Sequence, residues 1–358
     1  MRLTELRVEC LRLFDRVELE LGDGFSVFVG PNGSGKTSLL EAVYLLSHGR
    51  SFRATGRDAL SQMGSAGFAV FGKVSSHLTG RECRLGLARR SGRLEARVDG
   101  EEVSLGTLVR ACAVVCFEPG SHSLISGASE ERRRFTDWGV FHVEHEFLST
   151  WRRYQRALRQ RNALLRDNAP SDHYEPWEHE MAQSGEQIAA LRVTYLMRLR
   201  PHLVSILEVF LGELGEFELS VDRGWGDEGS LADALIAGRA RDRERGYSSR
   251  GPHRADFSLG FEHAPRREHL SRGQEKLCAL AVLLAQARLF AEDSGEWPIL
   301  CLDDLASELD VAHYAQAIRL FRESGAQVLL TATGVPDAIR QDAGAIRMFH
   351  VEQGRIMA

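Results

Sequence analysis

The chain has 358 residues, which corresponds to about two domains of ordinary size. Hydrophobic residues make up 43% of it and charged residues 27%, a composition typical of folded domains that excludes intrinsic disorder. No segment approaches the roughly 20 consecutive apolar residues that cross a bilayer. The first five residues, Met-Arg-Leu-Thr-Glu, place charges where a signal peptide has its apolar core. We therefore expect a cytoplasmic protein without a membrane partner.

The cysteines, histidines and charges exclude further classes of protein. The six cysteines form no C-x-x-C pair, and the 13 histidines show no ligand spacing, so we expect no zinc site. The net charge of −5 argues against a wholly basic nucleic-acid-binding protein. Only three of the 45 basic residues are lysines: Lys36, Lys73 and Lys276. These positions are informative because the planar fork of arginine does not always replace a compact ammonium.

The first fifty residues predict three strands, a loop and a helix. Residues 3–8 and 17–21 alternate apolar with polar side chains, which indicates half-exposed strands. Residues 25–29 form a short apolar strand that runs directly into Gly30, and apolar residues then follow a helical period over 39–46. Further strand-like segments follow at 68–74, 83–88 and 113–117.

The rest of the chain predicts an inserted domain. A turn signal, Asp99-Gly100, lies between two strand-like segments, as a hairpin requires. A helical pattern follows, and strand character returns after Ala255, followed by a long helix over 273–291 and buried strands at 299–302 and 327–330. We therefore predict an α/β fold in which residues 1–128 and 246–358 form one domain, and residues 129–245 form a mainly helical domain inserted into it.

The segment from Gly30 to Thr37 matches the pattern G-x-x-x-x-G-K-[ST] between a strand and a helix. Its glycines let backbone N–H groups curl around phosphates, and the helix N-terminus adds its positive dipole end. In such a P-loop Lys36 reaches the β- and γ-phosphates and Thr37 offers a hydroxyl to Mg²⁺. The alternative is an ordinary glycine-rich turn. We predict a nucleotide site formed by Gly30, Pro31, Asn32, Gly33, Ser34, Gly35, Lys36 and Thr37.

Two carboxylates, Asp303 and Asp304, end the apolar strand at 299–302. A P-loop needs an acidic partner on another strand, and we expect Asp303 to hold Mg²⁺, directly or through water. Asp304 is then placed to polarise the attacking water. The alternative is that the two acids only cap the helix that follows, but the presence of the P-loop favours the catalytic interpretation.

A third motif, Leu-Ser-Arg-Gly-Gln at residues 270–274, opens the long apolar helix about thirty residues before Asp303. Ser271 and the backbone of Gly273 form a second helix N-terminus able to bind a γ-phosphate. The alternative is that Ser271 is a plain N-cap. That alternative explains neither the order of the three motifs nor the run Ser-Glu-Leu-Asp at 307–310.

In this order the P-loop, the L-S-x-G-Q signature, the acid pair and the S-x-L-D run resemble the motif set of ABC-type ATPases. The details resemble the RecF family of bacterial recombination proteins, and the matching segments span the chain: Gly30–Thr37 with Glu41-Ala42, residues 49–53, Arg133-Arg134-Phe135 with Asp137-Trp138, residues 251–256, residues 270–274 and residues 303–310. Two departures stand out. Only Arg12 remains of an aromatic-Arg-Asn sequence, and Thr331-Ala332-Thr333 stands where transporter ATPases carry a switch histidine, so the γ-phosphate sensor stays open.

The resemblance implies an ABC-type ATPase head with a helical insert, ATP and Mg²⁺ as cofactors, and weak DNA-stimulated hydrolysis in which Lys36 and Asp304 are catalytic. It also implies a head-to-tail homodimer around two ATP molecules. In that dimer Ser271, Gly273 and Gln274 of one subunit meet the γ-phosphate held by the other. Finally, it implies binding of single-stranded and duplex DNA near gaps, partnership with RecO and RecR, loading of recombinase, and support of replication and the SOS response.

The strongest local signal for nucleic acid is the run from Trp151 to Arg166, which contains six arginines, two aromatic residues and no acid. Arg152, Arg156 and Arg159 share one helical face and are our predicted phosphate contacts. The alternative is a solvated face that is paired with acids elsewhere.

Two other functions stay open from the sequence. The nucleotide-binding subunit of a membrane transporter shares the motifs but places far fewer residues between P-loop and signature than the roughly 235 found here. An SMC-like structural organiser of DNA requires a heptad arm, and none is visible in the sequence.

Overall fold

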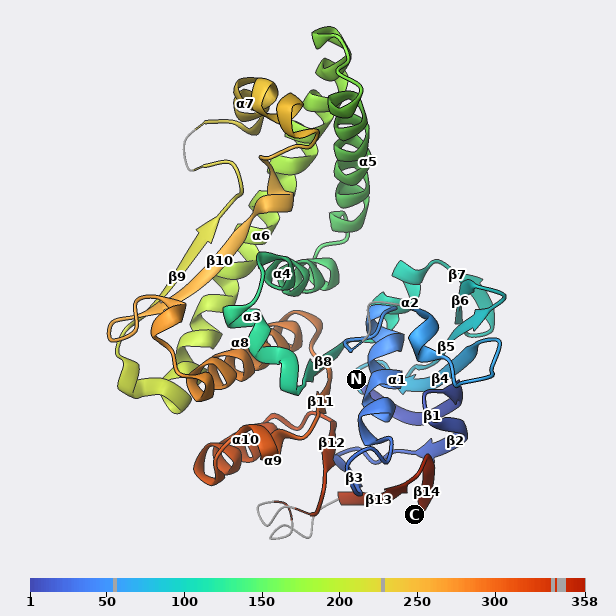
Figure 1. Cartoon of the computed structure of the whole chain (residues 1–358). Coiled ribbons are helices and arrows are strands. Elements are labelled where there is room, and N and C mark those ends of the chain that lie inside the picture. Colours follow the sequence, from blue (N-terminus) through green and yellow to red (C-terminus); the bar gives the residue numbers. More distant parts are fainter. Residues whose placement is uncertain (54–56, 227–228, 336–338, 340–345, 358) are drawn as a thin grey trace. The chain divides into compact units, whose positions relative to one another are not determined.

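The computed structural model describes residues 1–53, 57–226, 229–335, 339 and 346–357. Internal contacts divide the chain into two compact units: Met1–Ser121 with Val282–Ala358, and His122–Ala281. Figure 1 is coloured along the sequence, so the first unit takes both ends of the colour scale and the second unit takes its middle. The borders expected from the sequence, after residues 128 and 245, differ from these. The second border of the compact units falls inside one long helix, α8 (Arg272–Ser294).

The first unit contains a six-stranded sheet with the order β14-β13-β3-β12-β11-β8. Its strands are β3 (Phe25–Val29), β8 (Val114–Phe117), β11 (Ile299–Leu302), β12 (Val328–Ala332), β13 (Ile346–Glu352) and β14 (Arg355–Met357). All neighbouring pairs are parallel except β13 and β14. Every residue of β3, β11 and β12 is buried, as in a sheet covered on both faces. Because parallel strands end at one edge, Gly30 and Asp303 emerge together after β3 and β11.

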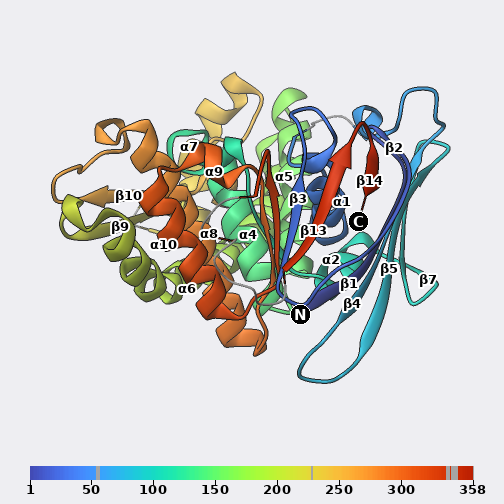
Figure 2. The same cartoon turned by 90° about the horizontal axis from the view of Figure 1, so that it is seen from below.

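The second sheet of this unit is antiparallel, with the order β2-β1-β4-β5-β6-β7. Figure 2 shows its long strands side by side; they are β1 (Arg2–Leu11), β2 (Phe14–Glu20), β4 (Phe68–Ser75), β5 (Glu82–Arg90), β6 (Arg93–Val98) and β7 (Glu101–Val103). Asp99 and Gly100, with φ of 51° and 90°, form the predicted turn. The turn joins β6 and β7, two short strands that the sequence pattern did not predict.

Helix α1 (Lys36–His48) contacts strands of both sheets and forms one core with them. Its fully buried side chains include Leu39, Leu40 and Leu46, which follow the predicted helical period. The first unit also contains α2 (Leu105–Ala111), α9 (Leu305–Glu308) and α10 (Val311–Ser324). Burial of α1 between the sheets therefore fixes the loop that precedes it.

The second unit is mainly helical. It contains α3 (Ser123–Ser126), α4 (Ser129–Val143), α5 (Phe147–Arg166), α6 (Glu175–Leu211), α7 (Leu231–Arg245) and the first residues of α8. Strands β9 (Phe217–Asp222) and β10 (Asp256–Phe261) form an antiparallel ribbon, of which β9 was not predicted. Short 3₁₀ helices in the chain lie at Arg57–Leu60, Pro119–His122, Ser171–Tyr174, Gly212–Leu214, Pro252–Arg254 and Arg267–His269. Within the described residues, no helix combines the length and apolarity needed to span a bilayer.

Two of the matching sequence segments meet inside the second unit. Arg133, in α4, donates to the backbone oxygen of Ala255 at 2.8 Å. Arg192 forms a two-pronged ion pair with Asp137 at 2.8 and 3.0 Å and donates to the carbonyl of Pro252 at 2.6 Å. These arginines therefore fasten the loop before β10 to α4 and α6.

Candidate nucleotide-binding site

The glycines of the P-loop are required by close packing and by backbone conformation. A Cβ on Gly30 would lie 2.1 Å from the carbonyl oxygen of Val351, and a Cβ on Gly35 would lie 2.9 Å from the Phe14 ring. Gly33 and Gly35 have φ of 79° and 112°, which other residues rarely adopt. The loop therefore turns sharply between the buried strand β3 and helix α1, as its sequence pattern predicts.

Lys36, the first residue of α1, is only 7% exposed and points into the loop. Its Nζ donates to the carbonyl oxygens of Gly30 at 2.7 Å and Pro31 at 2.9 Å. Burial lowers the pKa of the Lys36 ammonium, and the negative charges of Asp304 and Asp303 oppose that shift. The ammonium is thus held where phosphate oxygens bind in a P-loop.

Asp303 lies at the carboxyl end of β11 and receives two hydroxyl groups on one oxygen. Thr37 Oγ1 donates to Asp303 Oδ1 at 2.9 Å, and Thr331 Oγ1 donates to the same atom at 2.7 Å. Burial raises the pKa of the Asp303 carboxyl, and the two hydrogen bonds oppose the shift. The structure therefore brings Thr37 and Asp303 together, whereas Thr331 was singled out only by its position after the last core strand.

The oxygen donors of Thr37 and Asp303 suit Mg²⁺, which binds through one or two protein oxygens, waters and substrate phosphates rather than a full protein cage. No group of three or more His, Cys, Asp or Glu residues that could hold a metal is found in the described ranges. We therefore find the pair suited to a magnesium ion that a nucleotide brings with it.

Asp304 occupies the left-handed region with φ of 50°, in the position that caps α9. Its backbone N–H donates to Thr331 Oγ1 at 2.9 Å, so Thr331 connects the two aspartates. The Asp304 side chain makes no cap hydrogen bond to the helix, contrary to the simple capping alternative. It lines the same cavity as Lys36 and Thr37.

A cavity of about 460 Å³ unites these groups, within the size range of small-molecule sites. Besides the P-loop, Asp303, Asp304 and Thr331, it is lined by Arg12, Leu13, Arg53, Ala59 and Ser61. Arg12 forms a two-pronged ion pair with the buried Glu41 at 2.8 and 2.9 Å. Sequence reasoning noted Arg12 and Glu41 in separate motifs but missed that Arg12 and Arg53 face the nucleotide site.

The signature residues belong to the second compact unit, whereas the P-loop and both aspartates belong to the first. Ser271 Oγ accepts from the Gln274 N–H at 3.3 Å, and the Gln274 side chain accepts from the Ser271 N–H at 2.9 Å. This is a reciprocal capping box at the start of α8. Ser271 is thus an N-cap, as the simpler alternative states. Ser271 and Gly273 are also exposed, which leaves them accessible to a partner.

The arginine-rich run divides into an exposed face and a buried face of α5. Arg152, Arg156 and Arg159 are exposed and form no ion pair within the parts of the chain that the structure describes. Arg161 is instead fully buried, and Arg153 pairs with Glu180 at 2.8 Å. The three predicted arginines are therefore exposed, whereas the sequence alone could not show that Arg161 of the same run forms a buried ion pair.

Comparisons with known proteins bear on the whole chain. The family model described as RecF/RecN/SMC N terminal domain matches residues 2–357. The DNA replication and repair protein RecF of Xanthomonas euvesicatoria pv. vesicatoria (strain 85-10) is 48% identical, covering 99% of this chain and 98% of its own length. The RecF of Stenotrophomonas maltophilia (strain R551-3) is 47% identical over the full length of both chains.

Solved structures are also similar to this chain over nearly its whole length. The structure of the recombination mediator protein RecF with ATP, in the RecFOR pathway, has a TM-score of 0.89 and 26% identity, and the match covers 99% of this chain and 96% of the other. A Smc head domain from Pyrococcus furiosus has a TM-score of 0.58 at 14% identity, covering 99% of this chain and 94% of its own, and so supports the fold alone. The predicted fold class, an ABC-type ATPase head with a mainly helical insert, is confirmed.

Proposed function

The chain belongs to the RecF family, and from this membership we propose that it is an ATP-dependent recombination mediator of DNA repair and replication, acting in the cytoplasm on DNA. The observation that carries the proposal is the single cavity that unites Lys36 and Thr37 with Asp303 and Asp304. This set provides a phosphate cradle, a magnesium position and an acid for the attacking water in one place.

In this proposal each cavity residue has a separate task. Lys36 exchanges the carbonyl oxygens of Gly30 and Pro31 for β- and γ-phosphate oxygens, while the P-loop N–H groups surround the phosphates. Thr37 and Asp303 hold Mg²⁺, which when bound neutralises the phosphate charge. Asp304 orients the attacking water and accepts its proton. We propose that hydrolysis is slow and stimulated by DNA.

We further propose a head-to-tail homodimer in which the signature completes the site in trans. The accessible Ser271 and the backbone N–H of Gly273 would bind the γ-phosphate held by the partner's Lys36, with Gln274 supporting the turn through its bond to Ser271. Because each active site then needs two chains, ATP controls association.

The solved relative with ATP is described as part of the RecFOR pathway, which supports RecO and RecR as partners of this chain. We propose that the ATP-bound dimer holds single-stranded and duplex DNA near gaps, helps to load recombinase there and thereby supports replication and the SOS response. Arg152, Arg156 and Arg159 of α5, which are exposed and form no ion pair with any described residue, support the DNA contact.

Changing Arg152, Arg156 and Arg159 together to Ala is expected to weaken DNA binding about equally for every sequence. Each lost phosphate contact makes the log–log salt dependence shallower by about 0.9 for duplex DNA, so the triple variant should lose nearly three units of slope. Salt titration of duplex binding, with ATP present at matched occupancy, measures this slope.

The matched control changes Arg90 and Arg93 to Ala, because both are exposed arginines of the β5–β6 hairpin in the first unit. Their loss should leave the slope unchanged. An unchanged slope in the triple variant would move the DNA contact away from α5, and failure of the wild-type protein to bind DNA with ATP would contradict the proposed function itself.

A further inference from the structure

The loop after α7 presents an exposed aromatic side chain against an arginine. Tyr247 is 42% exposed, and the Arg254 guanidinium lies 5.3 Å from the centre of its ring. Arg254 is itself exposed and forms no ion pair among the residues that the structure describes. A guanidinium at this distance from an aromatic ring is attracted to it, so the two side chains form a cation–π pair at the surface.

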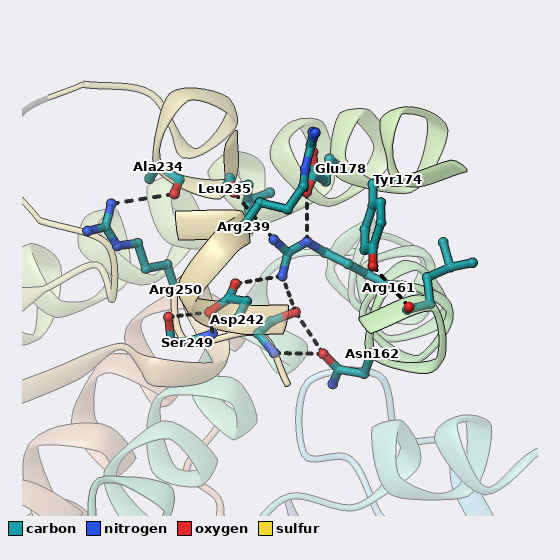
Figure 3. Close-up of polar contacts among 12 residues, drawn as sticks. Arg161, Asn162, Tyr174, Glu178, Ala234, Leu235, Arg239, Asp242, Ser249 and Arg250 are labelled. Carbon is teal, nitrogen blue, oxygen red and sulfur yellow. Dashed lines mark hydrogen bonds and ion pairs between the residues drawn. The ribbon is translucent and has the colours of Figure 1, made fainter. Parts of the chain in front are cut away.

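Buried polar contacts hold this loop against α5 (Figure 3). Asn162 Oδ1 accepts from both the N–H and the hydroxyl of Ser248, at 2.8 and 2.7 Å. The Ser249 N–H donates to Asp242 Oδ1 at 3.0 Å, and Asp242 is ion-paired to Arg161 of α5 at 2.7 Å. Ser248 and Ser249, which follow Tyr247, are therefore held to α5 directly through Asn162 and indirectly through the buried pair of Asp242 and Arg161.

The other end of the loop is fixed in the same way. His253 Nδ1 lies 2.6 Å from the hydroxyl of Tyr154, and its Nε2 lies 3.0 Å from the carbonyl oxygen of Ser248. Burial lowers the pKa of His253 to about 4. The neutral ring then accepts from Tyr154 and donates to Ser248. Because both ends of the loop are anchored, the Tyr247–Arg254 pair is pre-organised for contact with a ligand.

The arginine face of α5 leads to this loop. Arg152, Arg159 and Arg166 are spaced seven residues apart, which is about two helical turns, so they lie on one side of the helix. These three residues form the arginine face of α5. Arg166 is exposed, and its Cγ lies 3.4 Å from the position that a Cβ on Gly246 would take. The end of the arginine face therefore lies next to the residue that precedes Tyr247.

Space for a ligand is available beside the pair. A hollow of about 680 Å³ is lined by Arg254, Ser249, Trp225 and Ser258 among other residues. Of the two carboxylates at its wall, Asp256 pairs with Arg132 at 2.6 and 2.9 Å, and Asp222 accepts from the Gly224 N–H at 2.7 Å. Among the described residues that line the hollow, Arg254 is the cationic side chain, and it forms no ion pair with any described carboxylate.

We propose that Tyr247 and Arg254 form a stacking platform for an unpaired base of single-stranded DNA whose backbone follows the arginine face of α5. The inference rests on the proposed DNA-binding function and deepens it by assigning where a single strand is recognised. Base stacking on an aromatic ring tolerates any sequence, because every base has a π-face. Bases inside a duplex are already stacked and paired, so they cannot use the platform.

The test compares Tyr247→Ala with Tyr247→Phe, in the presence of ATP. Fluorescence anisotropy measures binding to a labelled oligothymidylate and to a labelled duplex of equal length. The Ala variant should bind the single strand about tenfold more weakly or worse, and the duplex as the wild type does. The Phe variant should retain both affinities, because the ring is kept.

Ile236→Ala is the matched control, since Ile236 is an exposed apolar side chain of α7 in the same unit. It should change neither affinity. Unaltered single-strand binding in Tyr247→Ala, or an equal loss on the duplex, overturns the platform while leaving the DNA-binding function in place. Absence of binding to both DNAs by the wild type instead overturns the proposed function, and the platform with it. Circular dichroism confirms that each variant is folded.

Discussion

Lys36→Arg is expected to abolish ATP binding while the protein stays folded. The Lys36 ammonium is held within the loop, 2.7 and 2.9 Å from the carbonyl oxygens of Gly30 and Pro31. Arginine keeps the charge but replaces a compact ammonium by a wide planar fork. Equilibrium binding of a fluorescent ATP analogue measures the loss, and circular dichroism measures the fold.

Lys73→Arg is the matched control for this experiment. Lys73 lies in β4 and pairs with the exposed Glu82 at 2.8 Å, where a fork fits as well as an ammonium. This variant should bind ATP normally. Normal ATP binding by Lys36→Arg as well would show that the P-loop is not the nucleotide site.

Arg161→Leu is expected to lower the free energy of unfolding of the helical unit by about 3–5 kcal/mol, because a buried ion pair loses one partner. Arg161 is fully buried and donates to Glu178 at 3.0 Å and to Asp242 at 2.7 Å (Figure 3). It also reaches Ser248 at 2.7 Å. Leucine leaves the two carboxylates inside the unit with less compensation. Urea unfolding followed by circular dichroism measures the change.

Arg153→Leu is the matched control on the same helix. The Arg153 side chain is 47% exposed, and its partner Glu180 is 33% exposed, so their ion pair at 2.8 Å contributes at most about 1 kcal/mol. Equal shifts in the two variants would mean that the Arg161 network adds nothing beyond a surface pair.

The nucleotide site could be predicted because its residues form short contiguous motifs. The eight residues from Gly30 to Thr37 include the end of a strand, a loop and the start of a helix. Asp303 follows a run of four apolar residues. Parallel strands place such ends together, so two local patterns predict one site. Thr331 escaped assignment because its role depends on hydrogen bonds to Asp303 and Asp304 from a strand that carries no motif.

The helical unit was harder to predict because its decisive contacts join distant residues. Arg161 looks like its exposed neighbours until Glu178 and Asp242, 17 and 81 residues away, are brought against it. Asp242 stands among arginines in the sequence, but its ion pair is formed with Arg161. Strand β9 was missed although residues 217–222 alternate apolar and polar side chains, the pattern of a half-exposed strand, because the segment was included in a long region interpreted as helical.

The central claim is that ATP joins two chains through the P-loop of one and the signature of the other. Sedimentation equilibrium with a non-hydrolysable ATP analogue and Mg²⁺ tests it, using the wild type, Ser271→Arg and, as a control, Ser149→Arg at an exposed serine of α5. The account predicts dimers of the wild type and of Ser149→Arg, and an ATP-bound monomer of Ser271→Arg. A dimer of Ser271→Arg with wild-type affinity would contradict it.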